Sequence, residues 1–334
     1  DLGGRSEHFT PIPSTWLKMT DILLFWAAKG IDGFRCDMAE MVPAAFWKYA
    51  TAKVKEHFPN VIFIGEVYAP NQYRNYLAAG FNYLYDKVGM YDCLRDVMCG
   101  YRPASDITSA WQSVDDIHDH MLNFLENHDE QRIASDFFAG DAKKGIPALM
   151  VAALFQSNPM MIYAGQEFGE KGMAKEGFSG IDGRSTIFDY WNTPTVMKAF
   201  YNIGRLSPQQ RYIRDTYYKI LRLCNEETAI SEGLTYDLMY ANFDKLTFDT
   251  SKLFAFMRKK DKDLLLIVAN FDKEAQEVSV TIPEHAIEFL RIRQNFYLMT
   301  DLLTGESIDA VISPNGEIKM SVSGYNGRIW KITM

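Results

Sequence analysis

Three carboxylates, two of them with a basic neighbour, follow apolar runs that are typical of buried strands. They are Asp37 after IDGFRC with Arg35 beside it, Glu66 after VIFIG, and Asp129 after MLNFLEN with His128 beside it. Successive acids lie 29 and then 63 residues apart, the spacing of one and then two strand–helix units. Because the carboxyl ends of parallel strands meet at one edge of a sheet, we expect the three acids to converge on one site.

Three carboxylates at one edge suit two kinds of chemistry. Retaining glycoside hydrolysis uses one carboxylate as nucleophile and a second as acid, about 5 Å apart, and a third can stabilise positive charge or bind sugar hydroxyls. Metal-assisted hydrolysis is the competitor, since carboxylates also bind divalent cations. Against a metal, Arg35 beside Asp37 would repel a cation, and no histidine pair has ligand spacing. We therefore favour glycoside hydrolysis and expect no metal.

Each of these residues also has a purely structural interpretation. A lone acid after a strand is commonly a helix cap or a turn former. Arg35 could form a structural ion pair with Asp37, and His128 could be a buried histidine with satisfied hydrogen bonds. An Arg35–Asp37 pair is compatible with function, because the cation would also hold the carboxylate in place. Three acids that each follow an apolar strand favour chemistry over three independent caps.

The elements that must position these residues alternate between strand and helix. Apolar runs predict strands at residues 31–37, 61–67, 81–86, 121–129 and 159–167. Helical periodicity predicts helices at residues 16–29, 46–57, 145–156 and 208–225. This alternation predicts an α/β fold with a parallel sheet.

Near residue 234 the pattern changes to short strands separated by turns. Alternating or apolar runs occur at residues 253–259, 264–271, 276–282, 318–324 and 328–334. Turn sequences lie between them at residues 301–305 and 314–316. We therefore expect a separate antiparallel β domain at residues 234–334.

Composition excludes several other classes of protein. A chain of 334 residues with 47% apolar content can bury a large core. Its 35 basic and 43 acidic residues, net charge −8, create no field that attracts nucleic acid, and apolar stretches such as residues 148–155 are too short to cross a bilayer. We expect neither nucleic acid nor membrane as a partner. Four scattered cysteines favour a reducing, cytoplasmic compartment, although an absent N-terminus would leave secretion or a periplasmic location open.

Taken in order, three motifs resemble conserved regions of the α-amylase family of glycoside hydrolases, family 13. They are GFRCDMAEMVP at residues 33–43, FIGEV at 63–67 and FLENHD at 124–129. YAGQE at 163–167 and FDYW at 188–191 also resemble that family, and the β-rich tail resembles its C-terminal domain. The resemblance implies a (β/α)8 barrel of which only the part resembling strands 4 to 8 is present, followed by an all-β antiparallel sandwich.

The resemblance also implies a role for each acid. Asp37 would be the nucleophile that forms a covalent glycosyl intermediate, oriented by Arg35. Glu66 would be the general acid and then the base that activates water, and its apolar approach VIFIG agrees with a desolvated carboxyl group. Asp129 would stabilise the oxocarbenium-like transition state, with His128 on the same sugar.

Aromatic side chains near strand ends could stack on pyranose rings. The candidates are Tyr68, Tyr85, Tyr163, Tyr190 and Trp191. Packing at the barrel rim explains each of them equally well. We expect substrate contact only at Tyr68, because it lies two residues beyond Glu66.

The chain departs from the family in its N-terminal part. No counterpart of the first three barrel strands precedes Trp16, and residues 1–15 resemble the end of the excursion after the third strand. We divide the chain into this remnant, a partial barrel at residues 16–233 and the β domain. An open partial barrel would expose apolar edges, so we expect the rest of the protein or another chain to supply the missing strands.

A second departure follows the expected nucleophile. The family's Lys-His pair is replaced by Glu40 and Met41, which removes support for calcium and for the usual endo-acting specificity. We expect a retaining glycosidase without a cofactor, acting on α-linked glucans such as starch, maltodextrins or maltooligosaccharides. A transglycosylase, a non-catalytic carbohydrate-binding relative and a metal hydrolase remain the alternatives.

Overall fold

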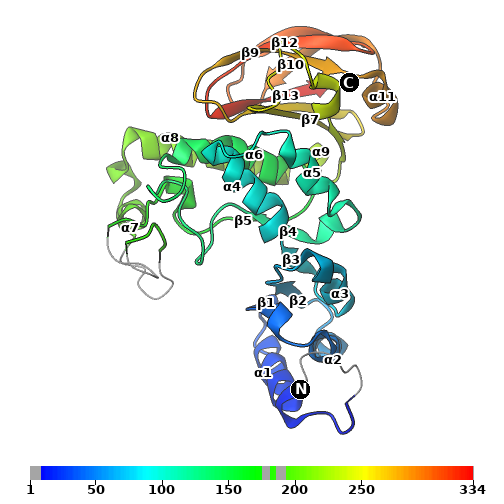
Figure 1. Cartoon of the computed structure of the whole chain (residues 1–334), viewed down its shortest axis with the longest axis vertical. Helices are drawn as coiled ribbons and strands as arrows, with labels where there is room; N and C mark the ends of the chain where they lie inside the picture. Colours follow the sequence, from blue (N-terminus) through cyan, green and yellow to red (C-terminus); the bar gives the residue numbers. More distant parts are fainter. Residues whose placement is uncertain (1–8, 175–180, 186–192, 334) are drawn as a thin grey trace. The chain divides into compact units, whose positions relative to one another are not determined.

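A computed structural model describes residues 9–174, 181–185 and 193–333. The chain forms two compact units (Figure 1). The first contains residues 1–89 and 115–122, and the second contains residues 90–114 and 123–334. The predicted boundaries after residues 15 and 233 stay predictions.

The first unit is built from parallel strands and helices in alternation. Its elements are α1 (Ser14–Ala27), β1 (Gly33–Cys36), α2 (Ala44–His57), β2 (Ile62–Gly65), α3 (Tyr73–Ala78) and β3 (Tyr83–Tyr85). Helix α2 buries Trp47, Ala50 and Val54, which recur at helical spacing, and the Trp47 ring packs against Phe81 with centroids 5.1 Å apart. Phe81 lies just before β3, so this packing holds α2 against the sheet.

The pairing of β1 with β2 determines where Asp37 and Glu66 lie along the sheet. The two strands pair in parallel from Gly33 opposite Ile62 to Cys36 opposite Gly65. Asp37 and Glu66 are the next residues on each chain segment, so they lie at the same level of the same sheet edge.

Strand β4 (Met121–Phe124) belongs to both units. Its first two residues pair with β3 in the first unit, and its last two pair with β5 (Met160–Met161) in the second. The parallel strands of the described residues follow the order β1-β2-β3-β4-β5. The predicted parallel sheet is confirmed.

The second unit continues with helices and then becomes mostly β. Its helices are α4 (Asp92–Cys99), α5 (Asp106–Gln112), α6 (Gly145–Leu154), α7 (Pro194–Tyr201), α8 (Pro208–Glu226), α9 (Thr228–Ser231), α10 (Met239–Asn242) and α11 (Glu284–Phe289). All ten residues of α6 are buried, as its uniformly apolar sequence predicts. Helix α8 begins with a capping box in which Ser207 and Gln210 bond each other's backbone N–H.

The C-terminal strands form two antiparallel sheets, drawn above α6 and α8 in Figure 1. They are β6 (Leu234–Asp237), β7 (Leu253–Lys260), β8 (Asp263–Asn270), β9 (Gln276–Ile282), β10 (Asn295–Asp301), β11 (Ser307–Ile312), β12 (Gly316–Val322) and β13 (Asn326–Thr333). Among the described residues, the larger sheet has the order β11-β10-β13-β8-β7-β6, and β12 pairs with β9 in the smaller. The antiparallel β architecture is confirmed, although the sequence did not predict β6, β10 and β11.

A buried arginine joins this β domain to the helices before it. Arg258 on β7 is fully buried and donates to the carbonyl oxygens of Phe155, Ala229, Ile230 and Gly233. Phe155 is the C-cap of α6, where the helix dipole favours a cation, and the other three carbonyls lie in or just after α9. The β domain is therefore bonded to the helical portion of its own unit.

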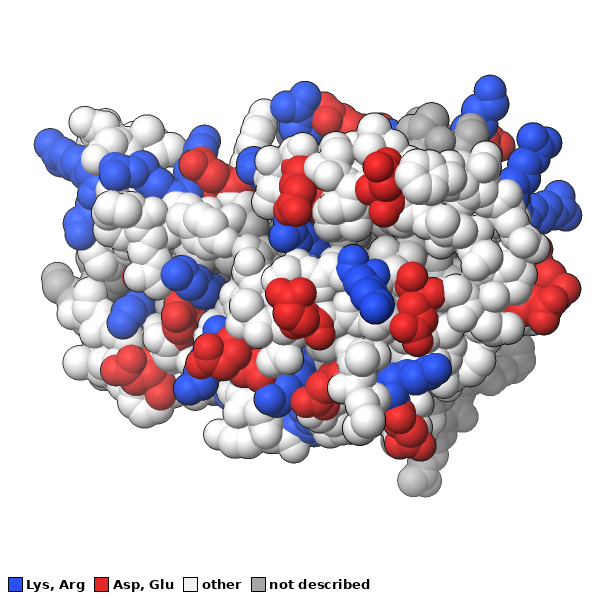
Figure 2. Space-filling model, turned by 90° about the horizontal axis from the view of Figure 1, so that it is seen from above, with Lys and Arg blue, Asp and Glu red and all other residues white. Residues whose placement is uncertain are grey.

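The surface carries charges of both signs. Figure 2 shows Lys, Arg, Asp and Glu side chains interspersed over the face in view. Within the described residues, no helix is both long enough and apolar enough to cross a membrane.

Candidate active site

Asp37 and Glu66 occupy contrasting environments at the end of β1 and β2. The Asp37 side chain is 74% exposed, whereas that of Glu66 is 8% exposed. An exposed carboxylate can approach a ligand directly, and a buried one is shielded from bulk water. The two neighbouring acids are thus suited to different tasks.

Arg35 contacts both acids through one guanidinium. Its Nη1 donates to Asp37 Oδ1 at 2.6 Å, and its Nη2 lies 3.1 Å from Glu66 Oε1, an ion-pair distance without the alignment of a hydrogen bond. Its Nε donates to the Tyr85 hydroxyl at 3.2 Å. Burial would lower the pKa of Arg35, but the hydrogen bonds to Tyr85 and Asp37 outweigh it and the pKa is raised. Arg35 is a fixed cation between the two carboxylates.

Two further donors fix the Glu66 carboxylate. The Met38 backbone N–H donates to Oε2 at 2.7 Å, and the Tyr68 hydroxyl donates to Oε1 at 2.8 Å. Met38 has the left-handed backbone conformation, with φ 43°, which is uncommon for a residue other than glycine. Strained backbone of this kind concentrates at functional sites. Both oxygens of Glu66 are therefore held in one orientation.

Tyr68, the aromatic residue at which the sequence predicts substrate contact, lies beside Glu66. Its hydroxyl reaches Glu66, and the Lys87 ammonium lies 5.9 Å from the centroid of its ring. The side chain is only partly buried. Stacking of Tyr68 on a sugar stays a prediction.

His128 and Asp129 lie in the second unit, after β4. His128 Nε2 is 3.2 Å from Asp129 Oδ2, and both side chains are partly exposed. The Asn127 side-chain oxygen accepts the backbone N–H of Asp129 and of Glu130, each at 2.9 Å. The Arg184 guanidinium donates to the Asp129 carbonyl at 2.7 Å. A compact turn thus presents the imidazole and the carboxylate together.

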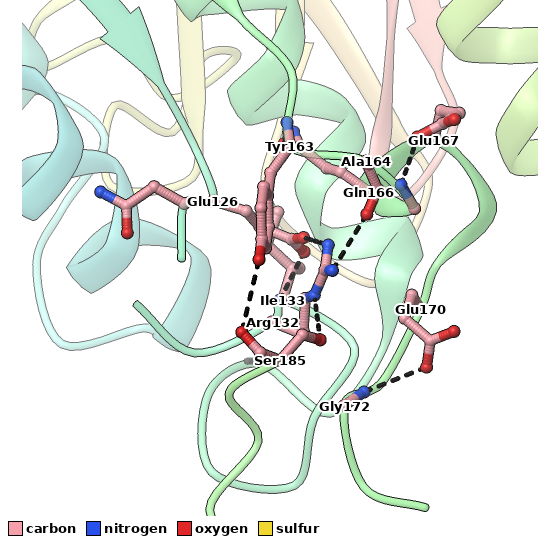
Figure 3. Close-up of polar contacts among 12 residues, drawn as sticks. Glu126, Arg132, Ile133, Tyr163, Ala164, Gln166, Glu167, Glu170, Gly172 and Ser185 are labelled. Carbon is pink, nitrogen blue, oxygen red and sulfur yellow. Dashed lines mark hydrogen bonds and ion pairs between the residues drawn. The ribbon is translucent and has the colours of Figure 1, made fainter. Parts of the chain in front are cut away.

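A buried ion pair between Glu126 and Arg132 connects this turn to the segments after β5 (Figure 3). Arg132 Nη1 donates to Glu126 Oε2 at 2.9 Å, and both side chains are almost fully buried. The same guanidinium donates to Ser185 Oγ at 2.8 Å and to the Ala164 carbonyl at 2.9 Å, and it lies over the Tyr163 ring at 4.1 Å from the centroid. Arg132 therefore joins the segment that carries Asp129 to the segments after β5.

The predicted site residues thus fall into two groups. Arg35, Asp37, Glu66 and Tyr68 contact one another in the first unit, and His128 contacts Asp129 in the second. Convergence of the two groups stays a prediction. Tyr190 and Trp191, within the FDYW stretch at 188–191, lie outside the described residues.

Sequence reasoning missed several polar residues near these groups. Asp86 directly follows β3 and is 2% exposed, so the rule that selected Asp37 and Glu66 would have selected it as well. Glu40 accepts two backbone N–H groups from the loop after β2, for which the sequence held no signal. Glu126 and Arg132 lie six residues apart and gave no signal of their own. Among the described residues no cluster of three or more His, Cys, Asp or Glu side chains is arranged to hold a metal ion.

Comparison with known proteins adds a family and a set of relatives. A family model described as the alpha amylase catalytic domain matches residues 12–204. Neopullulanase 2 from Thermoactinomyces vulgaris is 23% identical over 316 residues, which cover 92% of this chain and 46% of that protein. Alpha-amylase 3 from Dictyoglomus thermophilum is 24% identical over 280 residues, 78% of this chain and 54% of that one. An alpha-1,4-glucan:maltose-1-phosphate maltosyltransferase from Rhodospirillum rubrum is 24% identical over 307 residues, 90% of this chain and 40% of that one.

These three relatives, and two similar solved structures, are longer than this chain. The chain spans about half the length of the curated relatives it matches. It is similar to the crystal structure of alpha-amylase from Geobacillus thermoleovorans complexed with acarbose, with a TM-score of 0.72 and 18% identity, over 96% of this chain and 64% of that one. It is also similar to a maltogenic alpha-amylase from Thermotoga neapolitana, with a TM-score of 0.70 and 18% identity, over 98% and 67% of the two chains. At these identities the likeness shows the fold.

Proposed function

This chain belongs to the alpha-amylase family, and we propose that the protein hydrolyses α-linked glucans with retention of the anomeric configuration. Starch, maltodextrins and maltooligosaccharides are the proposed substrates. The position of Arg35 supports the proposal most directly, because one guanidinium contacts both Asp37 and Glu66. A retaining mechanism needs two carboxyl groups about 5 Å apart, and two carboxylates bound to one guanidinium suit that requirement.

In this proposal the exposed and the buried acid have different roles. Asp37, bonded to Arg35 and open to solvent, attacks the anomeric carbon and forms a covalent glycosyl ester. Glu66, buried and fixed by the donors at Met38 and Tyr68, gives its proton to the leaving oxygen. It then takes a proton from the water that releases the sugar from Asp37. We propose that these steps require only the two carboxyl groups and water.

The second unit would supply the third acid. We propose that Asp129 stabilises the positive charge that develops on the sugar ring and that His128 binds a hydroxyl of the same sugar. The ion pair between Glu126 and Arg132 and the bond from Arg184 would hold the turn that presents them.

We also propose that further strands complete the barrel, either from the rest of the protein or from another chain. Among the described residues β1 pairs with β2 alone, which leaves one of its edges open. Helix α1, which precedes β1 in the chain, exposes apolar side chains at Leu17, Ile22, Phe25 and Trp26. An open strand edge and an exposed apolar helix face in the same unit suit the missing portion of an eight-stranded barrel.

Transfer of the glycosyl group to a sugar hydroxyl is the second candidate function. One relative is named a maltosyltransferase, and the covalent step at Asp37 would be common to hydrolysis and transfer. Product analysis separates the two, because hydrolysis yields only shorter oligomers and transfer also yields longer ones.

Turnover of maltooligosaccharides by the natural full-length protein tests the proposal. We expect shorter products from the wild type and a loss of about 10³-fold or more in kcat for Glu66→Gln and for Asp37→Asn, with circular dichroism showing that both variants are folded. A chelator should leave the rate unchanged, and loss of activity with the chelator would favour a metal hydrolase. A wild type that binds these glucans without turnover would contradict the proposal and favour a non-catalytic carbohydrate-binding protein.

A further inference from the structure

The Glu40 carboxylate joins the loop after β1 to the loop after β2. Its Oε2 accepts the backbone N–H of Tyr68 at 3.1 Å and that of Ala69 at 2.9 Å. These residues lie 28 and 29 positions from Glu40 in the sequence. Two N–H donors that converge on one charged oxygen form strong hydrogen bonds. We call this contact of Glu40 with Tyr68 and Ala69 the Glu40 latch.

Aromatic side chains hold the backbone that carries the latch. The Tyr76 hydroxyl contacts the carbonyl oxygens of Glu40 at 3.1 Å and of Val42 at 2.9 Å, and Trp47 Nε1 donates to the Ala39 carbonyl at 3.0 Å. Burial raises the pKa of Tyr76, so its hydroxyl stays protonated and able to donate. Trp47 and Tyr76 are themselves buried. Glu40 is therefore supported by packed side chains rather than by a free loop.

The latch ends on a residue that contacts Glu66. Tyr68 gives its backbone N–H to Glu40 and its hydroxyl to Glu66 Oε1. Movement of the Tyr68 backbone would move that hydroxyl, because one side chain connects the two bonds. Glu40 can thus affect Glu66 through Tyr68.

We propose that Glu40 is a positioning residue whose carboxylate holds the Tyr68 backbone so that the Tyr68 hydroxyl keeps Glu66 aimed at the leaving oxygen. This role rests on the proposed function, since it concerns the proton that Glu66 would deliver. Loss of the latch should weaken proton delivery to the leaving group more than it weakens binding or attack by Asp37.

A comparison of two leaving groups tests this role. The glycosidic oxygen of maltoheptaose needs a proton to leave, whereas the fluoride of α-maltosyl fluoride leaves with little help from an acid. In the natural full-length protein we expect Glu40→Ala to lower kcat/KM about 10- to 100-fold for maltoheptaose and less than about threefold for the fluoride. Glu40→Gln keeps an acceptor oxygen and should retain most of the wild-type kcat/KM for maltoheptaose.

A mutant cycle identifies the route. Tyr68→Phe removes the hydroxyl and should give the same selective loss, and Glu40→Ala combined with Tyr68→Phe should be no worse than the poorer single variant. Glu56→Gln is the matched control, because Glu56 pairs with Lys53 on the exposed face of α2. Glu56→Gln should leave kcat/KM for both substrates unchanged.

Several outcomes would overturn the role of Glu40. They are an equal loss on both substrates, additive losses in the double variant, or full activity in Glu40→Ala. If Glu40→Ala does not fold, Tyr68→Phe decides, and an equal loss on both substrates in Tyr68→Phe would overturn the role of Glu40. A wild type without turnover of either substrate would overturn the proposed function and this role with it, whereas an active wild type with unselective variants would overturn this role alone.

Discussion

The backbone N–H of Met38 donates to the Glu66 carboxylate across 2.7 Å, so the residue after the proposed nucleophile is bonded to the proposed acid. This bond depends on the left-handed conformation of Met38, with φ 43° and ψ 44°. In that conformation the chain turns sharply after β1, and the Met38 N–H points to Glu66, the residue that follows β2. The geometry of one carboxylate is thus coupled to the backbone beside the other.

Substitution of Met38 should reveal this strain. Met38→Gly removes a left-handed penalty of about 1 kcal/mol and adds a similar entropy to the unfolded chain, so the free energy of unfolding should change by less than about 1 kcal/mol. Met38→Val places a branched side chain in the same conformation and should cost about 1–2 kcal/mol, with a loss of activity. Urea unfolding and kcat measure the two effects. Equal stability of the glycine and valine variants would contradict the strained turn.

Arg35→Lys should separate charge from geometry. Lysine keeps the cation but cannot contact Asp37, Glu66 and Tyr85 at once, as the Arg35 guanidinium does. Loss of one charged hydrogen bond is worth about 1.5–3 kcal/mol, so kcat on maltooligosaccharides should fall about 10- to 100-fold. Steady-state kinetics checks this, with circular dichroism as the control for folding. Near wild-type kcat in Arg35→Lys would mean that the charge alone matters.

The buried pair of Glu126 and Arg132 should be important for stability. Glu126→Gln would leave the Arg132 guanidinium buried without its carboxylate partner, and breaking a buried pair costs about 3–5 kcal/mol. Urea unfolding of the variant should show this loss. The matched control is Glu226→Gln, which removes the partner of Arg222 on the exposed face of α8 and should change stability little. Equal effects of the two substitutions would contradict the structural role of the buried pair.

Cys36 should be unreactive while β1 is folded. Burial raises the pKa of its thiol to about 12, although the charge of Arg35 opposes the shift. At about pH 8 the thiolate fraction is therefore about 10⁻⁴, against about a quarter for an ordinary cysteine. Iodoacetamide labelling, followed by peptide mass spectrometry, should be at least about 100-fold slower in the native protein than in urea, and it should accelerate as the pH rises toward 12. Fast native labelling of Cys36 would contradict the burial of this strand.

The residues that could be predicted from the sequence are those fixed by local periodicity. Asp37 and Glu66 each follow an apolar run that predicts a strand, and the meeting of parallel strand ends at one edge was enough to predict where they lie. The Glu40 latch could not be predicted, because its partners lie 28 and 29 residues away and depend on the shape of two loops.

The missed strands have a similar physical cause. In β10, Phe296 and Leu298 are apolar yet 61% and 60% exposed, so hydrophobicity along the strand does not follow burial. Val311 on the neighbouring β11 is also apolar and 56% exposed. Pairing between these strands determines their structure, and a pairing between distant segments is not visible in either segment alone.

The most direct test of the central claim is the anomer released first from maltoheptaose, followed by proton NMR before mutarotation. The natural full-length wild type should release the α anomer, because two displacements, at Asp37 and then by water that Glu66 activates, restore the starting configuration. Glu66→Gln should release almost none. Initial release of the β anomer, or an undiminished rate in Glu66→Gln, would contradict the roles of Asp37 and Glu66.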